Sequence, residues 1–308
     1  MEKFRKLIAV GVLLACLGAT AAVWRGSDSD HKIGRSAGGD KIAVIRVEGV
    51  LSGGASSESW QGGTVGAETL ARQLSEAGQD PSVKAVLLRI NSPGGSVSAA
   101  EETAREIDRY KESGKPIVVS MGDMAASAGY WLAAGCDKIY ANPSTLTGSI
   151  GVYMPYLNLE GLYDKLGVRQ EKIKSGAHKD ILSPERPMTP QEREILQTMV
   201  SEMYDTFVDV VSKGRKLDPE AVRKLADGRV YTGRQAKALG LVDELGNFQD
   251  AIIATGELAG LGKTPVVKEL GADTSWRRLL RAESLLEQFL STSALTSVPT
   301  LTAPSLPQ

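Results

Sequence analysis

Short apolar segments alternate with amphipathic ones from residue 41 onward. Apolar, β-rich segments predict four strands, at 42–47, 83–90, 116–121 and 138–141. Segments with apolar residues three or four positions apart predict helices at 67–77, 97–113 and 128–134. Since parallel strands need a crossover of helical length between them, this order predicts a mostly parallel sheet with right-handed crossovers. The expected fold class is therefore α/β.

A longer helix is predicted over residues 190–213. Thr189 directly precedes it and Glu192 follows three positions later, which is the arrangement of a capping box. One face is marked by apolar residues at four-residue spacing, namely Ile195, Met199, Met203 and Phe207. A smaller closing unit ends near residue 270, so we place one domain at 41–270.

The first segment has the pattern of an export signal. Basic residues at positions 3, 5 and 6 precede an uncharged run of 18 residues, 7–24. As a helix this run would extend about 27 Å, close to the hydrocarbon thickness of a bilayer. The basic flank predicts a cytoplasmic N-terminus and an extracytoplasmic location for the rest of the chain. We therefore expect a single-pass anchor over 1–25 and localisation in the cell membrane.

Two other interpretations of this segment are open. Ala19-Thr20-Ala21 resembles the cleavage site of a secretory signal peptide, and Leu13-Leu14-Ala15 before Cys16 resembles that of a lipoprotein signal. We favour the uncleaved anchor because the apolar run continues past both candidate cleavage points.

Segments of different composition flank the domain. Residues 26–40 are polar and rich in Gly and Ser, which indicates a flexible tether. Residues 271–308 begin with a short amphipathic segment, 276–290, and end in a Ser/Thr/Pro/Leu tail that we expect to be disordered.

Charge and composition exclude several classes. The 36 Lys and Arg residues balance 37 Asp and Glu residues to a net charge of −1, whereas nucleic-acid binders usually have a basic excess. Two cysteines and two histidines cannot form a disulfide framework or a cysteine-only zinc site. We therefore expect no nucleic-acid partner, no metal and no other cofactor.

Three loops that follow predicted strands carry the candidate chemistry, since open α/β sheets place their sites at such loops. The first, 91–96, contains Gly94 and Gly95, which let backbone N–H groups approach a ligand, and Ser96 as a helix cap. The second, 122–130, places Ser127 among small residues at a strand-to-helix turn, as in nucleophile elbows. The third, 142–152, is dense in hydroxyls and glycine.

A nucleophilic serine also needs a base. The histidines are His31, in the tether, and His178, which adjoins Lys179 in a polar loop. A lysine can act as the base when loss of water lowers its pKa. The pattern alone leaves His178 and Lys179 open as alternatives.

Five blocks along the chain are distinctive, namely NSPGGS (91–96), GDMAASAGY (122–130), LTGSIGV (146–152), KSGAHKD (174–180) and YTGRQAKALGLVDELG (231–246). In this order they resemble bacterial signal peptide peptidase A in its short, single-length form. Members of that family are membrane-anchored serine proteases of the Clp protease/crotonase-like fold. The resemblance covers roughly residues 41–265 and implies that fold for this chain.

The resemblance also implies roles for particular residues. Ser127 would be the nucleophile of a Ser-Lys dyad, Lys179 its general base and Ser149 the hydroxyl that orients the lysine. The backbone N–H groups of Gly94 or Gly95 and of Ala128 would form the oxyanion hole. Many relatives have glycine at the position of Ala128, a change that leaves the N–H in place.

Partners follow from the same resemblance. It implies an endopeptidase that degrades signal-peptide remnants and other hydrophobic or unfolded peptides at the extracytoplasmic membrane surface. It also implies a homo-oligomer, an octameric ring, in which Ser127 meets Lys179 of a neighbouring protomer. A crotonase-like acyl-CoA enzyme would be cytoplasmic and would not need these two residues together, and a non-catalytic scaffold would not need either, so we favour the protease.

Overall fold

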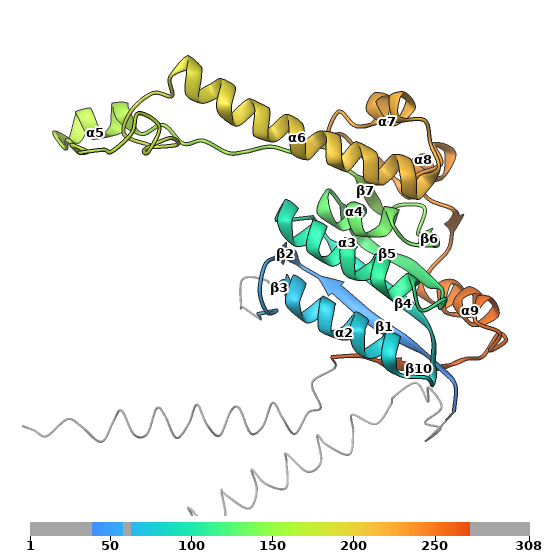
Figure 1. Cartoon of the computed structure of the whole chain (residues 1–308). Coiled ribbons are helices and arrows are strands. Elements are labelled where there is room, and N and C mark those ends of the chain that lie inside the picture. The colour runs from blue at the N-terminus through green and yellow to red at the C-terminus, as the bar shows by residue number, and fades with distance from the viewer. Residues whose placement is uncertain (1–38, 58–62, 272–308) are drawn as a thin grey trace, which may run out of the picture. The chain divides into compact units, whose positions relative to one another are not determined.

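The computed structural model describes residues 39–57 and 63–271 (Figure 1). The expected anchor and the tail beyond residue 271 lie outside the described residues, as does the tether except for its last two positions. Within the described ranges, no helix has both the length and the apolar character needed to cross a membrane. The chain divides into two compact units, 1–268 and 269–308, and the account below concerns the first.

The centre of this unit is a sheet in which strands follow the order β10–β1–β4–β5–β6–β9. The pairings of β1 with β4, β4 with β5, β5 with β6 and β6 with β9 are all parallel. The strands are β1 (Lys41–Glu48), β4 (Val83–Ser92), β5 (Ile117–Ala126), β6 (Lys138–Ala141), β9 (Glu244–Leu245) and β10 (Val266–Glu269). The predicted α/β class with a parallel-dominated sheet is confirmed, and it fits a Clp protease/crotonase-like fold.

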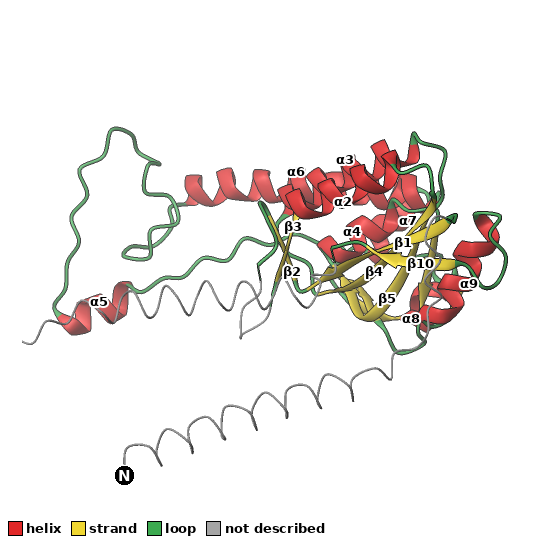
Figure 2. Cartoon of the chain, turned by 90° about the horizontal axis from the view of Figure 1, so that it is seen from below, coloured by secondary structure: helices red, strands yellow, loops and turns green. Residues whose placement is uncertain are grey.

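Helices cover both faces of the sheet (Figures 1 and 2). Helices α2 (Ala67–Gln79) and α3 (Val97–Lys111) lie side by side on one face, and α9 (Phe248–Leu258) packs on the other. Ile42, Val44 and Leu87 form a core with Ala251 and Ile252 of α9. Because both faces are buried, the strands are continuous apolar runs instead of alternating ones.

Two strand predictions need correction around the site. Strand β5 was expected to end at residue 121 but continues to Ala126. The third predicted loop contains a strand, β7 (Leu146–Gly148), parallel to β5 and antiparallel to β8 (Val230–Thr232). The hydroxyls of this segment explain the difference, because Thr145 and Thr147 donate to the carbonyls of Gly122 and Ala125 at 2.6 and 2.7 Å. Tertiary pairing thus makes a strand of a segment too short to show a strand pattern in the sequence.

The long helix α6 (Pro190–Arg215) begins with the predicted capping box of Thr189 and Glu192. Its C-terminal half packs on α4 (Ala128–Ala134), where Phe207 and Trp131 have ring centroids 4.7 Å apart. The predicted apolar face is correct only there, since Met199 in the other half is 44% exposed.

Smaller elements complete the described unit. They are β2 (Val50–Ser52), β3 (Thr64–Gly66), α5 (Glu160–Leu166), α7 (Pro219–Leu225) and α8 (Gly233–Ala238). Strands β2 and β3 form a separate parallel pair.

Residues 151–189, which we call the arm, leave the sheet after β7 and end at the start of α6, and α6 then leads back to α4 (Figure 1). The arm includes α5, none of whose residues is buried, and both views show α5 away from the sheet (Figures 1 and 2). Large apolar side chains are exposed along it, namely Tyr153, Leu157, Leu162, Leu166, Val168 and Ile173. Such a run of exposed apolar residues is typical of a surface that another molecule covers.

Gly214→Ala is expected to destabilise the protein, although alanine is the better helix former by about 1 kcal/mol. A Cβ at Gly214 would lie 1.9 Å from the carbonyl oxygen of Ala134, at the end of α4. Because backbone atoms would have to separate, at a cost of about 1–3 kcal/mol, the midpoint of thermal unfolding should fall by a few degrees. Gly161→Ala in α5, where a Cβ meets nothing within 4 Å, is the control and should not lower the midpoint. Equal midpoints for the two variants would contradict the close approach of α6 to α4.

Candidate active site

Ser127 forms the turn between β5 and α4. Its φ and ψ of 53° and −124° lie in a region that residues with a Cβ avoid. The turn is fixed on both sides, because its N–H donates to Gly148 O of β7 and its carbonyl accepts from Trp131 N–H of α4, both at 2.9 Å. The half-buried hydroxyl makes no capping bond to α4. A strained serine between a strand and a helix, with its hydroxyl uncommitted, has the geometry of a nucleophile elbow.

The surroundings of Ser127 keep this strain in place. Every residue of α4 is buried, so the helix cannot turn to relax the Ser127 backbone. On the strand side, the β5 residues before the turn pair with β7 in register, Ala126 with Gly148. Small side chains at Ala126 and Ala128 leave room for this tight geometry, as the sequence predicts.

Gly94 lies against the Ser127 turn. A Cβ at Gly94 would lie 2.7 Å from Ser127 Cβ and 3.1 Å from Ala128 N, and the φ of Gly94 is +110°. Glycine is therefore required here by both contact and backbone conformation. The fold thus brings the first two predicted loops together, although Gly94 and Ser127 are 33 residues apart in the chain.

The two candidate glycines differ in what their N–H groups do. Gly94 N–H donates to Ser92 Oγ at 3.1 Å, whereas within the described ranges Gly95 N–H has no hydrogen-bond partner. Ala128 N–H, at the first position of α4, also lacks one, as expected at a helix N-terminus. Gly95 and Ala128 therefore offer two free N–H donors on the two loops that meet at Ser127.

Strand β2 holds the Gly95 loop in place. Leu51 N–H donates to Gly94 O at 2.8 Å, and Leu51 O accepts from Ser96 N–H at 2.9 Å. A Cβ at Gly95 would come within 2.0 Å of Leu51 O. Ser96 caps α3 as predicted, accepting a bond from Ala99 N–H.

Ser149 lies next to the same turn. It follows Gly148, whose carbonyl accepts the Ser127 N–H, and its own N–H donates to Arg229 O at 2.9 Å. Its φ of 51° is also left-handed. The structure thus gathers Ser127, Gly94, Gly95, Ala128 and Ser149 around one turn.

Lys179 is not part of this group. It lies in a turn of the arm, is exposed, and makes no hydrogen bond or ion pair with Ser127. The alternative base, His178, is half-buried with Nδ1 4.0 Å from Glu192 Oε1. One chain alone therefore does not bring either candidate base to the serine.

Other side chains bear on the site. Ser92 supports the Gly94 loop and was missed, although a serine two positions before a glycine pair is a turn signal. Cys136 is buried, and burial raises the pKa of its thiol, as is typical of a packing residue. Among the described residues, no group of three His, Cys, Asp or Glu side chains could hold a metal ion.

Comparison with known proteins identifies the family. The profile of peptidase family S49 matches residues 109–262, which is half of the chain and includes the Ser127 turn and the arm. The chain belongs to peptidase family S49.

Several known proteins are similar to most of this chain. A provisionally named signal peptide peptidase SppA of Enterococcus faecium is 41% identical over 73% of this chain and 65% of its own length. Protease 4 of Salmonella typhi is 42% identical over 72% of this chain but only 35% of its own length. A provisionally named protease of Synechocystis is 40% identical over 83% of this chain and 88% of its own length. The chain thus spans less than two thirds of the first two relatives.

Gly94→Ala is expected to slow the labelling of Ser127 by a serine-directed reagent. The new Cβ would displace the serine turn, and a shift of about 1 Å at a reacting group can cost about 100-fold in rate. The measurement is the rate at which a fluorophosphonate labels Ser127, followed by mass spectrometry. Gly114→Ala is the matched control, since Gly114 also has a positive φ (+74°) but meets nothing within 4 Å. Equal labelling of both variants would contradict the assignment of Gly94 to the site.

Proposed function

We propose that this protein is a serine endopeptidase that uses a Ser-Lys dyad of Ser127 and Lys179. The observation that carries the proposal is the strained Ser127 turn beside the free N–H groups of Gly95 and Ala128 in a member of peptidase family S49. A nucleophile and two adjacent donors are the parts that acyl transfer requires.

The reaction follows from these parts. Neutral Lys179 takes the Ser127 proton as the serine oxygen attacks the peptide carbonyl. The N–H groups of Gly95 and Ala128 donate to the oxyanion of the tetrahedral intermediate, and the protonated lysine then gives its proton to the leaving amine. A water molecule, activated by the same lysine, hydrolyses the acyl-enzyme. Ser149 orients the Lys179 amine toward Ser127.

The dyad forms between two protomers in this proposal. A lysine acts as a base when removal from water disfavours its charged form, whereas Lys179 is exposed in the single chain. The arm that carries it also exposes large apolar side chains. A ring of like chains, an octamer in our proposal, covers the arm and buries Lys179 at the neighbour's Ser127.

The substrates proposed are signal-peptide remnants and other hydrophobic or unfolded peptides. One relative bears the name signal peptide peptidase, which supports this substrate class. We propose that the apolar N-terminal segment anchors the enzyme in the cell membrane, with the catalytic domain on the extracytoplasmic side. An enzyme held there meets peptides that remain in the bilayer after processing.

Ser127→Ala and Lys179→Ala are each expected to lower kcat by at least about 1,000-fold, because each removes one half of a group that acts as a unit. The measurement is hydrolysis of a fluorogenic peptide with an apolar P1 residue by the full chain in detergent. Lys165→Ala, which removes a lysine of α5 in the same arm, is the control and should keep the parent rate. Activity retained in either dyad variant would refute the assignment of that residue.

Mixed assemblies test the sharing of the dyad. Rings formed from both Ser127→Ala and Lys179→Ala subunits contain junctions at which an intact serine meets an intact lysine. Co-refolded or co-expressed mixtures should therefore regain a measurable fraction of the parent activity, while each variant alone stays inactive. Absence of activity in rings verified to contain both subunits would show that the dyad lies within one chain.

A further inference from the structure

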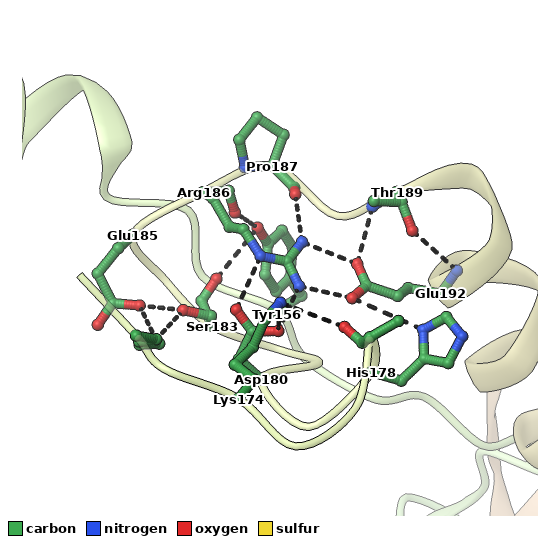
Figure 3. Close-up of polar contacts among 12 residues, drawn as sticks. Tyr156, Lys174, His178, Asp180, Ser183, Glu185, Arg186, Pro187, Thr189 and Glu192 are labelled. Atoms are coloured by element: carbon green, nitrogen blue, oxygen red, sulfur yellow. Dashed lines mark hydrogen bonds and ion pairs between the residues drawn. The ribbon is translucent and has the colours of Figure 1, made fainter. Parts of the chain in front are cut away.

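Arg186, an arginine of the arm, uses all of its N–H groups in hydrogen bonds near the turn that carries Lys179. Arg186 donates from Nε and Nη2 to the two carboxylate oxygens of Asp180, at 3.0 and 2.9 Å. It also donates from Nη1 and Nη2 to Glu192, at 2.9 and 2.5 Å, and from Nη1 to Pro187 O at 3.0 Å. These five bonds match the five N–H groups of a guanidinium. Figure 3 shows Arg186 between the two carboxylates.

Asp180, Arg186 and Glu192 together form what we call the Arg186 cluster. Its Glu192 end is anchored to α6. The Glu192 side chain is only 1% exposed, and it also accepts from Thr189 N–H at 2.9 Å as part of the capping box. Hydrogen bonds from Arg186, followed by the backbone bond from Thr189, lower the pKa of Glu192 to about 2. The carboxylate is therefore charged at every pH at which the enzyme would work.

The Asp180 end holds the turn that carries Lys179. Lys174 Nζ bonds Asp180 Oδ1 at 2.7 Å and Ala177 O at 3.2 Å, while Lys179 N–H donates to Gly176 O at 3.2 Å. On the other side of Lys179, His178 lies beside Glu192 (Figure 3). Both chain neighbours of Lys179 thus face the Arg186 cluster, whereas Lys179 itself is exposed.

A second set of hydrogen bonds joins the two parts of the arm at the base of this turn. Tyr156, on the outgoing part of the arm, donates its hydroxyl to the carbonyl of Arg186. Leu159 N–H donates to Pro184 O at 2.7 Å. The outgoing and returning parts of the arm are therefore bonded to each other next to the cluster, and the Lys179 turn has a fixed base.

We propose that Arg186 is a positioning residue for Lys179: by joining Asp180 to Glu192 it fixes the Lys179 turn to the start of α6. This inference rests on the proposed role of Lys179 as the base. An arginine is required because only its planar fork can bind two carboxylates in this way, and a lysine offers three donors from one point. Arg186 touches neither the serine nor the substrate in this role.

Arg186→Lys in the full chain tests the proposal by steady-state peptide hydrolysis across pH. We expect kcat to fall about 10- to 100-fold with KM changed less than about twofold, since the loss is of geometry at the reacting groups. The acidic limb of the kcat/KM profile should move to higher pH, because a displaced lysine is better hydrated and water favours its charged form. A residue with only a structural role would lower the amount of folded enzyme without moving this limb.

Asp180→Asn provides an independent variant and Lys172→Gln the matched control. Asp180→Asn weakens the bond to the turn while leaving the Arg186–Glu192 bonds and the capping box intact, so it should reproduce the fall in kcat and the shift of the limb. Lys172 bonds Ser183 and pairs with Glu185 at 2.6 Å in the same arm, and it makes no hydrogen bond or ion pair with residues 178–180. Its variant should keep the parent kcat and pH profile.

Assembly size, measured by analytical ultracentrifugation, decides between the outcomes. Assembled Arg186→Lys and Asp180→Asn enzymes with lowered kcat and a shifted limb support the proposal. Parent kinetics in both variants overturn it, and so does a loss of activity in both that follows only from loss of assembly. Lys179→Ala in the same assay distinguishes failure of the positioning role from failure of the proposed function. If Lys179→Ala is fully active, the proposed function itself has failed.

Discussion

The backbone strain at Ser127 is the constraint on which the rest of the site depends. A residue with a Cβ at φ 53° and ψ −124° costs about 1–3 kcal/mol and persists only where its neighbours allow nothing else. Here one side is bonded to β7 and the other begins a fully buried helix. The extension of β5, the β7 strand and the packing of α6 on α4 all serve to hold this one turn. The close contact of Gly94 follows from it, because no side chain fits beside a serine so placed.

A second constraint is that the serine turn and Lys179 lie in two different parts of the fold, one held by the core and one exposed. The serine and the two free N–H groups lie at turns held between strands and helices of the core, whereas Lys179 lies on an arm with few buried residues. Within the described chain the arm is held by charges and backbone bonds around Arg186 more than by apolar packing. Directional bonds can fix a turn where no core is available, which explains how an exposed arm could present a lysine with defined geometry.

The sequence predicted the core well and the arm poorly, for physical reasons. Buried parallel strands are apolar runs and α4 is bounded by Ser127, so β6 and α4 have the predicted bounds. Strand β7 was missed because its stability comes from Thr145 and Thr147 bonding to β5, a tertiary effect that no local pattern reports. Gly94 and Ser127 were expected at the site because their loops follow strands, whereas Ser149 was expected from the family resemblance. The Arg186 cluster had no such signal, since its charged residues belong to a loop and a helix start.

The charges of the cluster also bear on how the enzyme would respond to pH. Hydrogen bonds from Arg186 hold the pKa of Asp180 and of Glu192 below their usual values, and the same bonds raise the pKa of Arg186. A carboxylate with a depressed pKa stabilises the fold above its unfolded pKa of about 4, and this contribution is lost as the pH falls through the folded value. None of the three groups therefore changes charge near neutral pH, so the cluster keeps its geometry there. The pH dependence of hydrolysis in that range is then assigned to the proposed dyad and not to the Asp180–Arg186–Glu192 bonds.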